Sequence, residues 1–222
     1  MNDLALGIVH LRTILIIVHL MGLMLGMGCA LFLDIYMLRR LYTHRLELND
    51  VRLLQLGSSV VMLGLALLWM SGLGFLLDYA ATAPEKLANP KIWSKLTIVA
   101  VLTVNGVLLH AVVFPRFAAR IGRRVFDEDQ TSADSLLFLA TGVVSSLSWM
   151  AAFVLGVVKE INNVVAWDVI LLSYLALLAA AGAVTMIAHT IFASMLERGI
   201  LRSERLSLRY AAAARLRGSS RS

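Results

Sequence analysis

The sequence predicts an all-α fold: a polytopic transmembrane bundle of five helices, with its N-terminus outside and its C-terminus inside. The 222-residue chain is 59% hydrophobic with a mean hydropathy of +0.82, which excludes an ordinary soluble domain. Its apolar residues form five stretches of 20 or more residues, each long enough to cross about 30 Å of hydrocarbon at about 1.5 Å per residue. The five stretches are 13–38, 53–81, 96–115, 135–158 and 164–197.

Flanking residues set the limits of the first three stretches. The first ends in a charged loop, 39–52, and the second ends in the loop 82–92, which carries two prolines. Pro115 should end the third stretch, because proline has no amide hydrogen to continue a helix.

The fourth stretch follows the polar segment 116–134, and Asn162-Asn163 forms a tight turn before the fifth. All five stretches are too long and too continuously apolar for barrel strands. Helices are therefore the structure that satisfies their backbone groups in lipid.

The basic residues assign a side of the membrane to each loop. Fifteen of the 20 are arginines that follow the first, third and fifth stretches, and cytoplasmic loops carry such an excess. Four lysines fall on the other side, and the four tryptophans map toward the outer interface, as in an aromatic belt. The arginines are Arg39, Arg40, Arg45, Arg52, Arg116, Arg120, Arg123, Arg124, Arg198, Arg202, Arg205, Arg209, Arg215, Arg217 and Arg221; the lysines are Lys86, Lys91, Lys95 and Lys159; the tryptophans are Trp69, Trp93, Trp149 and Trp167.

One transmembrane domain, 1–198, and a basic cytoplasmic tail, 199–222, account for the whole chain. The net charge of +6 follows from the positive-inside pattern and does not indicate nucleic-acid binding. The first stretch is too long for a signal peptide and has no basic segment before it, so we expect it to remain as an anchor. Size and charge pattern indicate a multi-pass protein of a bacterial inner membrane, in contact with lipid and with a second copy or a redox partner.

Histidines inside the stretches are candidates for function, because polar side chains are expensive in lipid. Counted from the arginines that follow them, His110 lies about 9 Å and His189 about 13 Å from the cytoplasmic end. His19 lies near the outer end, about 20 Å from both along the membrane normal. We therefore predict that His110 and His189 face each other at similar depth.

Small residues accompany these histidines at helical spacing. A haem needs an axial nitrogen and a slot for its flat ring, and a histidine with small residues one and two turns away supplies both. The pattern favours a haem b, with helix packing around a hydrogen-bonded histidine as the alternative. The motifs are Thr103-x2-Gly106-x3-His110, Gly182-x2-Thr185-x3-His189, and His19 with Gly22 and Gly26.

Asp34 is a further costly residue within the first stretch. Its simplest interpretation is an ion pair with Arg39 or Arg40. If it points inward, it shares a layer with His110 and His189, and two imidazoles with a carboxylate are a ligand set for a transition metal. Soft copper ligands are also present in the first stretch, although such a stripe more often fills gaps in packing: Met21, Met24 and Met27.

Two stretches resemble the CopD/HemJ-like group of bacterial membrane proteins. They are ILIIVHLMGLMLGMGCALFLDIYMLRRL in the first helix, and WSKLTIVAVLTVNGVLLH with FPRF in the third. The resemblance covers about a third of the chain and implies that His19 matches an early histidine of the group and Lys95 a lysine that opens a later helix. It also implies a link to haem and protoporphyrinogen oxidation or to copper uptake.

These observations favour a membrane protein that binds haem b and acts in electron transfer or haem and porphyrin redox chemistry. His110 and His189, with Gly106 and Gly182, are the preferred ligand set from depth, and His19 with Lys95 is the alternative set that the resemblance implies. A copper or small-solute permease and a cofactor-free scaffold subunit are the alternatives. No CxxCH, HExxH or nucleotide-binding motif is present, so the sequence does not assign an enzymatic activity.

The charge pattern makes a direct prediction of orientation. Reporter fusions should place the loops 39–52 and 116–134 and the C-terminus in the cytoplasm, because the arginines follow these helix ends. An active periplasmic reporter at the C-terminus would contradict this orientation.

Overall fold

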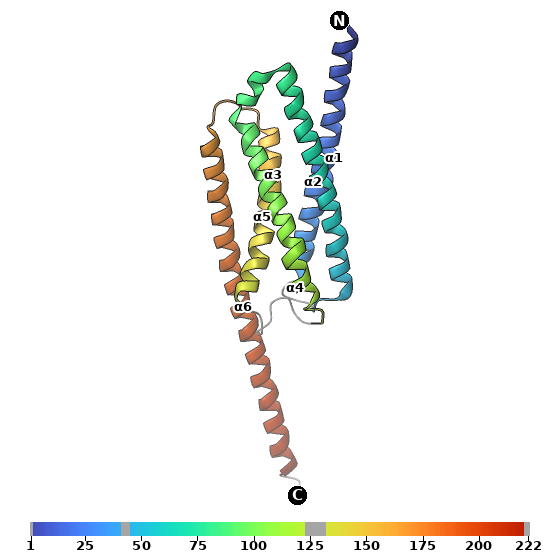
Figure 1. The fold of residues 1–222 in the computed structure, drawn as a ribbon. Coiled ribbons are helices and arrows are strands. Elements are labelled where there is room, and N and C mark those ends of the chain that lie inside the picture. Colours follow the sequence, from blue (N-terminus) through green and yellow to red (C-terminus); the bar gives the residue numbers. More distant parts are fainter. Residues whose placement is uncertain (1, 41–44, 123–131, 220–222) are drawn as a thin grey trace. The chain divides into compact units, whose positions relative to one another are not determined.

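The structure is a computed structural model that describes residues 2–40, 45–122 and 132–219, with side chains described for 10–40, 45–122 and 133–195. His44, Arg123, Arg124 and Arg221 lie outside the described residues. Within these ranges the chain is helical and contains no strand (Figure 1). The elements are α1 (Asn2–Arg40), α2 (Leu48–Thr82), η1 (Pro84–Ala88), α3 (Pro90–Leu108), η2 (Leu109–Val113), α4 (Phe114–Ala118), α5 (Ser132–Val157) and α6 (Trp167–Ser219).

Five helical segments of the described chain are long and apolar enough to cross a membrane, as the sequence predicts. The protein is therefore a multi-pass membrane protein. The segments are His10–Arg40, Leu48–Thr82, Pro90–Ala118, Ala133–Val157 and Trp167–Met195.

The prediction that Pro115 ends the third helix is wrong. The helical path continues through a π-helical turn, η2, directly into α4, in which Pro115 is the second residue. Proline at this position removes one backbone donor and crowds the carbonyl four residues earlier. The wider turn just before it, in which Phe114 N–H donates to the Leu109 carbonyl, accommodates that change without ending the helix.

The loops also follow local rules. The two prolines of the loop 82–92 start η1 and α3, where a missing amide hydrogen costs nothing. Asn89 caps α3, because its side chain accepts a hydrogen bond from Lys91 N–H at 3.1 Å. Asn163 has φ +57°, the left-handed conformation that asparagine tolerates, and so supports the predicted turn before α6.

The chain divides into two units, 1–180 and 181–222, which we describe separately. The predicted domain boundary at residue 198 falls inside α6, which runs unbroken from Trp167 to Ser219. The candidate residues of the first three helices lie in the first unit, whereas His189 and Gly182 lie in the second.

Helices α1 and α2 form an antiparallel pair (Figure 1). Contacts between them repeat every seven residues along each helix. At 1.5 Å per residue, successive pairs are about 10.5 Å apart. We call this set the α1–α2 ladder. Its pairs are Arg12–Asp78, His19–Ser71, Gly26–Gly64, Leu33–Gly57 and Arg40–Asp50.

The middle of the ladder is a backbone contact. A Cβ at Gly64 would stand 2.5 Å from Gly26 N and 2.7 Å from the Gly22 carbonyl oxygen. Small residues permit such an approach, and in lipid this close packing replaces the hydrophobic force that joins helices in water. The ring of Trp149 from α5 lies against Gly26 on the same level, 2.2 Å from a Cβ built there.

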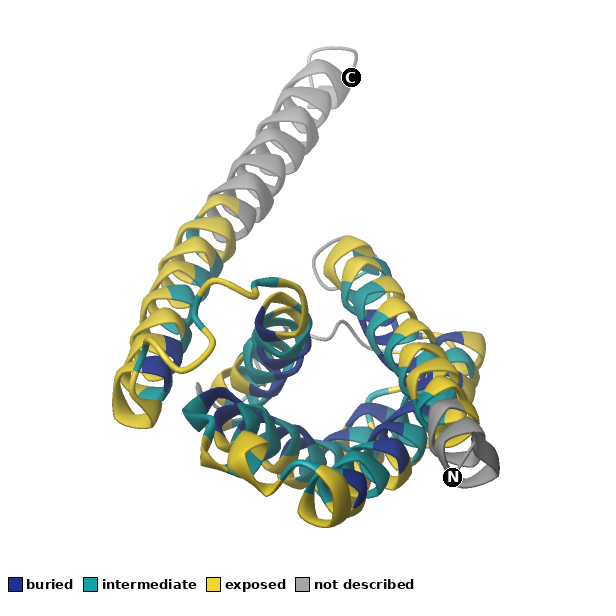
Figure 2. Cartoon of the chain, turned by 90° about the horizontal axis from the view of Figure 1, so that it is seen from above, coloured by how far each residue is buried: buried dark blue, intermediate teal, exposed yellow. Residues whose placement is uncertain are grey.

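The prediction that Trp149 belongs to the aromatic belt at the outer interface is therefore wrong. Its side chain is only 1% exposed and packs between the helices of the first unit. The first unit buries its side chains on the faces that its helices turn toward one another (Figure 2). Two clusters mark opposite ends of this unit. The first cluster lies at the end that carries Arg40 and consists of Leu46, Val51, Val113, Phe117 and Phe138. The second lies near the start of α3 and consists of Ile98, Leu155, Ile170 and Tyr174.

The glycine contact predicts unequal effects of the same substitution on α2. Gly64→Ala should lower the free energy of unfolding by about 1–3 kcal/mol, because its methyl group would collide with the α1 backbone. Gly72→Ala, where a Cβ would meet nothing within 4 Å, should be neutral or stabilising by up to about 1 kcal/mol. Thermal denaturation of the two variants in detergent measures the difference; equal effects would contradict the contact.

Candidate functional site

His19 and Ser71 form a hydrogen bond between α1 and α2 that fixes the imidazole. Nδ1 of His19 lies 2.8 Å from Oγ of Ser71. The single hydroxyl hydrogen of Ser71 points to its own helix, where Oγ lies 2.6 Å from the Leu67 carbonyl and 3.2 Å from that of Leu68. The hydroxyl oxygen must then accept from His19, so the hydrogen-bond network assigns the neutral ring its proton on Nδ1.

This arrangement leaves a lone pair on Nε2 of His19. Histidines that bind metals typically donate their other ring N–H to an oxygen acceptor, which sets the tautomer and the ring orientation. Phe75 also contacts the ring, edge to face, with centroids 5.8 Å apart. The imidazole is thus held by a hydrogen bond and a ring contact, and the His19 side chain as a whole is half-buried.

Lys95, near the start of α3, is the charged residue whose electrostatic interaction reaches the His19 imidazole. It is half-buried and has no hydrogen-bond acceptor or ion-pair partner among the residues whose side chains the structure describes. Lys91, one turn earlier, is 3% exposed and donates to the Val158 carbonyl at the end of α5. The two lysines therefore differ: Lys91 completes a helix end, whereas Lys95 offers a free ammonium group.

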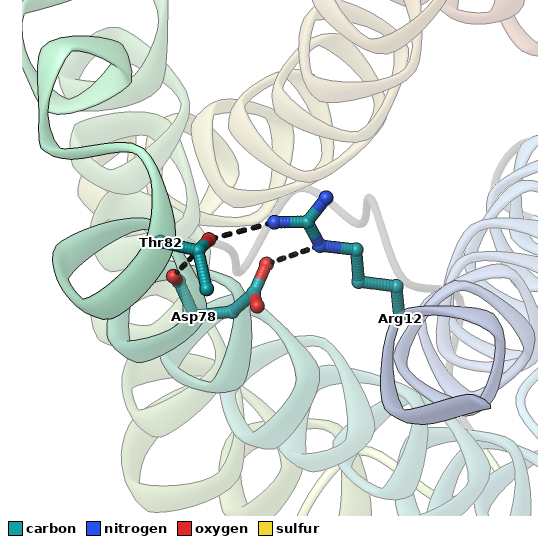
Figure 3. A network of polar contacts seen from close by, with 3 residues as sticks. All are labelled: Arg12, Asp78 and Thr82. Carbon is teal, nitrogen blue, oxygen red and sulfur yellow. Dashed lines mark hydrogen bonds and ion pairs between the residues drawn. The ribbon is translucent and has the colours of Figure 1, made fainter. Parts of the chain in front are cut away.

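An ion pair closes the ladder one step beyond His19 (Figure 3). Arg12 Nε lies 2.7 Å from Asp78 Oδ2, and another guanidinium nitrogen donates to Thr82 Oγ1 at 2.7 Å. Thr82 in turn donates to the Asp78 carbonyl. The Asp78 side chain is 3% exposed, so Arg12 compensates a buried charge.

A second ion pair closes the other end of the ladder. Arg40 lies 3.2 Å from Asp50, whose side chain is 1% exposed, and Tyr36 OH donates to the same carboxylate. Asp50 also accepts from Glu47 N–H at 2.8 Å and so caps the start of α2. Because Arg40 is engaged here, the predicted pairing of Asp34 with this arginine is wrong.

Asp34 faces α5 instead. Its Oδ2 accepts from the Ser146 hydroxyl at 2.6 Å, and Ser146 Oγ also lies 3.1 Å from the Gly142 carbonyl. In the sequence Ser146 stands beside Ser145 and Ser148, and no local pattern pairs it with Asp34. The contact depends on how α1 and α5 pack, which no spacing within either helix shows.

The pairing of His110 with His189 stays a prediction, since the two residues belong to separate units. His110 is exposed, within η2, and its ring meets that of Phe114 edge to face at 5.1 Å. Beside it, a Cβ at Gly106 would stand 3.3 Å from Met62 Sδ, so a haem ring there would have to displace that methionine. A Cβ at Gly182 would meet nothing within 4 Å.

Sequence reasoning missed Ser71 and Asp78 as partners of the first helix. A signal was present: the two residues are seven apart on α2, as His19 and Arg12 are on α1. Residues seven apart lie on the same helix face, and antiparallel helices bring such faces together in reverse order. Among the described side chains, no three of the His, Cys, Asp and Glu residues gather as a metal site.

Comparison with known proteins finds no family model, no curated protein and no solved structure that matches this chain.

The Arg12–Asp78 pair predicts strong asymmetry between two acidic residues. Asp78→Ala should destabilise the protein by about 3 kcal/mol, because it leaves the Arg12 guanidinium without its buried partner. Asp134→Ala removes a carboxylate that is 22% exposed and pairs with Arg116, which is 46% exposed, and with Arg120. Because this group is nearer to solvent, its loss should cost about 1 kcal/mol or less. Denaturation in detergent compares the two, and an Asp134→Ala effect as large as that of Asp78→Ala would contradict the prediction.

Proposed function

We propose that this membrane protein binds a b-type haem through Nε2 of His19 and acts in electron transfer or in haem and porphyrin redox chemistry. The observation that carries the proposal is the hydrogen bond from His19 Nδ1 to Ser71, which frees Nε2 as a lone pair of fixed direction. An imidazole oriented in this way is the usual axial ligand of haem iron in proteins.

The neighbouring residues fit such a ligand. Lys95 would pair with a haem carboxylate, since an ammonium group without a partner in this setting favours an anion. Phe75 supplies an apolar surface beside the imidazole. Bound haem would supply a redox-active iron; the chain would orient its ring, hold its carboxylate and limit the access of water.

The ligand set of His19 and Lys95 is also the one that the resemblance to the CopD/HemJ-like group implies, and membership of that group remains part of the proposal. The pair of His110 and His189 remains a prediction. The small residues beside both histidines are occupied: Met62 lies next to Gly106, and α2 and Trp149 lie against Gly22 and Gly26. The fixed hydrogen-bond partner of His19, Ser71, is therefore what favours His19 over that pair. A bacterial inner membrane is the proposed location.

The alternatives lack an observation of this kind. The copper hypothesis needs the methionines of α1 to converge, but Met24 is 73% exposed whereas Met27 packs against the core. The scaffold hypothesis rests on glycine grooves as protein contacts, and the groove of Gly22 and Gly26 is already used in the contact of α1 with α2 and α5.

Absorption spectra of the purified protein, expressed with ample haem, test the proposal. The parent should show a Soret band, and His19→Ala should lose it because the axial nitrogen is gone. Ser71→Ala should retain the imidazole but weaken haem binding by about 10–100-fold, since the oxygen that accepts the hydrogen bond from His19 Nδ1 is removed.

His110→Ala is the matched control and should keep the parent spectrum. Loss of the spectrum in His110→Ala but not in His19→Ala would favour the pair predicted from depth. A colourless parent would overturn the proposal as a whole.

A further inference from the structure

The carboxyl group of Asp34 lies in a membrane-spanning helix, and its printed partner among the described side chains is a hydroxyl group and not a cation. Its contact with Ser146 is its one hydrogen bond to a described side chain. It lies six residues before Arg40, about 9 Å along α1. An ionisable residue at such a position is expensive to keep charged, and in membrane proteins it commonly marks a functional site.

The charged groups near Asp34 can be placed for the described parts of the elements that pack along α1. On α1 itself, Arg40 and Tyr36 bind Asp50 of α2. Between residues 53 and 77 of α2, and between 136 and 157 of α5, the sequence has no acidic residue, basic residue or histidine. His110, beyond α5 on η2, is exposed and contacts Phe114. Arg39 follows on the next turn of α1, and Ser146 remains the group that binds the carboxyl.

Ser146 can stabilise both forms of this carboxyl group. Its hydroxyl has one hydrogen and two acceptors within reach, Asp34 Oδ2 at 2.6 Å and the Gly142 carbonyl at 3.1 Å. When Asp34 is ionised, Ser146 donates to it. When Asp34 is protonated, its O–H donates to Ser146 Oγ, and Ser146 donates to the Gly142 carbonyl.

We propose that Asp34 is a reversible protonation site of this membrane protein, with Ser146 as the residue that satisfies it in both states. A proton from water binds Oδ2, and the Ser146 hydroxyl hydrogen turns from Oδ2 to the Gly142 carbonyl; release of the proton reverses both movements. No heavy-atom bond changes, and no oxidant or reductant takes part. The α5 backbone is uncrowded at this point, because a Cβ at Gly142 would meet nothing within 4 Å. The proposal does not depend on haem binding.

Infrared difference spectroscopy of the full-length protein in lipid, recorded as a function of pH, tests this site. The parent should show a carboxyl C=O band that appears as the pH falls and disappears as it rises, and Asp34→Asn should lose that band. Ser146→Ala should keep the band but move it to higher frequency, because the protonated carboxyl loses its hydrogen-bond acceptor.

Ser145→Ala is the matched control, since Ser145 is the neighbouring serine of α5 and no hydrogen bond joins it to Asp34 among the described side chains; its band should match that of the parent. Circular dichroism confirms that each variant keeps its helices. The proposal is overturned if no pH-dependent carboxyl band is lost in Asp34→Asn. It is also overturned if sodium at constant ionic strength abolishes the band, since Asp34 would then hold a metal ion in place of the proton.

Discussion

The contact of Gly26 with Gly64 is the constraint on which the remaining structure depends. Two helix backbones touch at this level, so neither helix can slide without a clash. The contact sets one register for the whole length of α1 and α2. In that register each seventh residue of α1 meets each seventh residue of α2, the repeat that left-handed helix pairs use. A shift of one turn would separate Arg12 from Asp78, His19 from Ser71 and Arg40 from Asp50 together.

The polar pairs of the ladder act mainly on specificity. Two ion pairs close its ends, where water is near, and apolar or glycine contacts occupy the levels between Ser71 and Asp50. A buried ion pair gains little net stability over apolar packing, but a misplaced partner leaves an uncompensated charge. Alternative registers are therefore penalised at both ends at once. His19 benefits from this, because its tautomer is set by a serine whose position the register determines.

The sequence was sufficient for the number, type and order of the helices, because apolar length is a local property. It was insufficient wherever tertiary contacts decide. Pro115 lies inside a continuous helical path because a π-helical turn before it absorbs the missing hydrogen bond. Trp149 was assigned to the interface by depth, but it packs against Gly26, a contact that only the proximity of α5 creates.

The candidate sites show the same limit. Counting residues from a charged end measures depth along one helix and carries no information on which face a side chain occupies. It therefore ranked His110 and His189 above His19, although His19 has the fixed partner. Counting along α1 likewise pairs Asp34 with Arg39 or Arg40, whereas Arg40 binds Asp50 across the ladder and Asp34 binds Ser146 of α5. The seven-residue spacing of Arg12 and His19, matched by that of Ser71 and Asp78, was the one local trace of these contacts.

His19 and Asp34 are 15 residues apart on one helix, which separates them by about 22 Å. That distance bounds how strongly a charge at one proposed site would act on the other. At an effective dielectric constant of about 20, two unit charges at this distance interact by about 0.8 kcal/mol. One unit of pKa corresponds to about 1.4 kcal/mol, so the field alone would link an electron at His19 to a proton at Asp34 only weakly.

Strong linkage would require a change in packing. The two contacts able to transmit it are the ladder, which holds His19 through Ser71, and the pairing of α1 with α5, which holds Asp34 through Ser146. Trp149 of α5 lies against Gly26, at a level of α1 between His19 and Asp34. A displacement of α5 that altered the Asp34 site would therefore also press on the glycine contact that sets the register of His19.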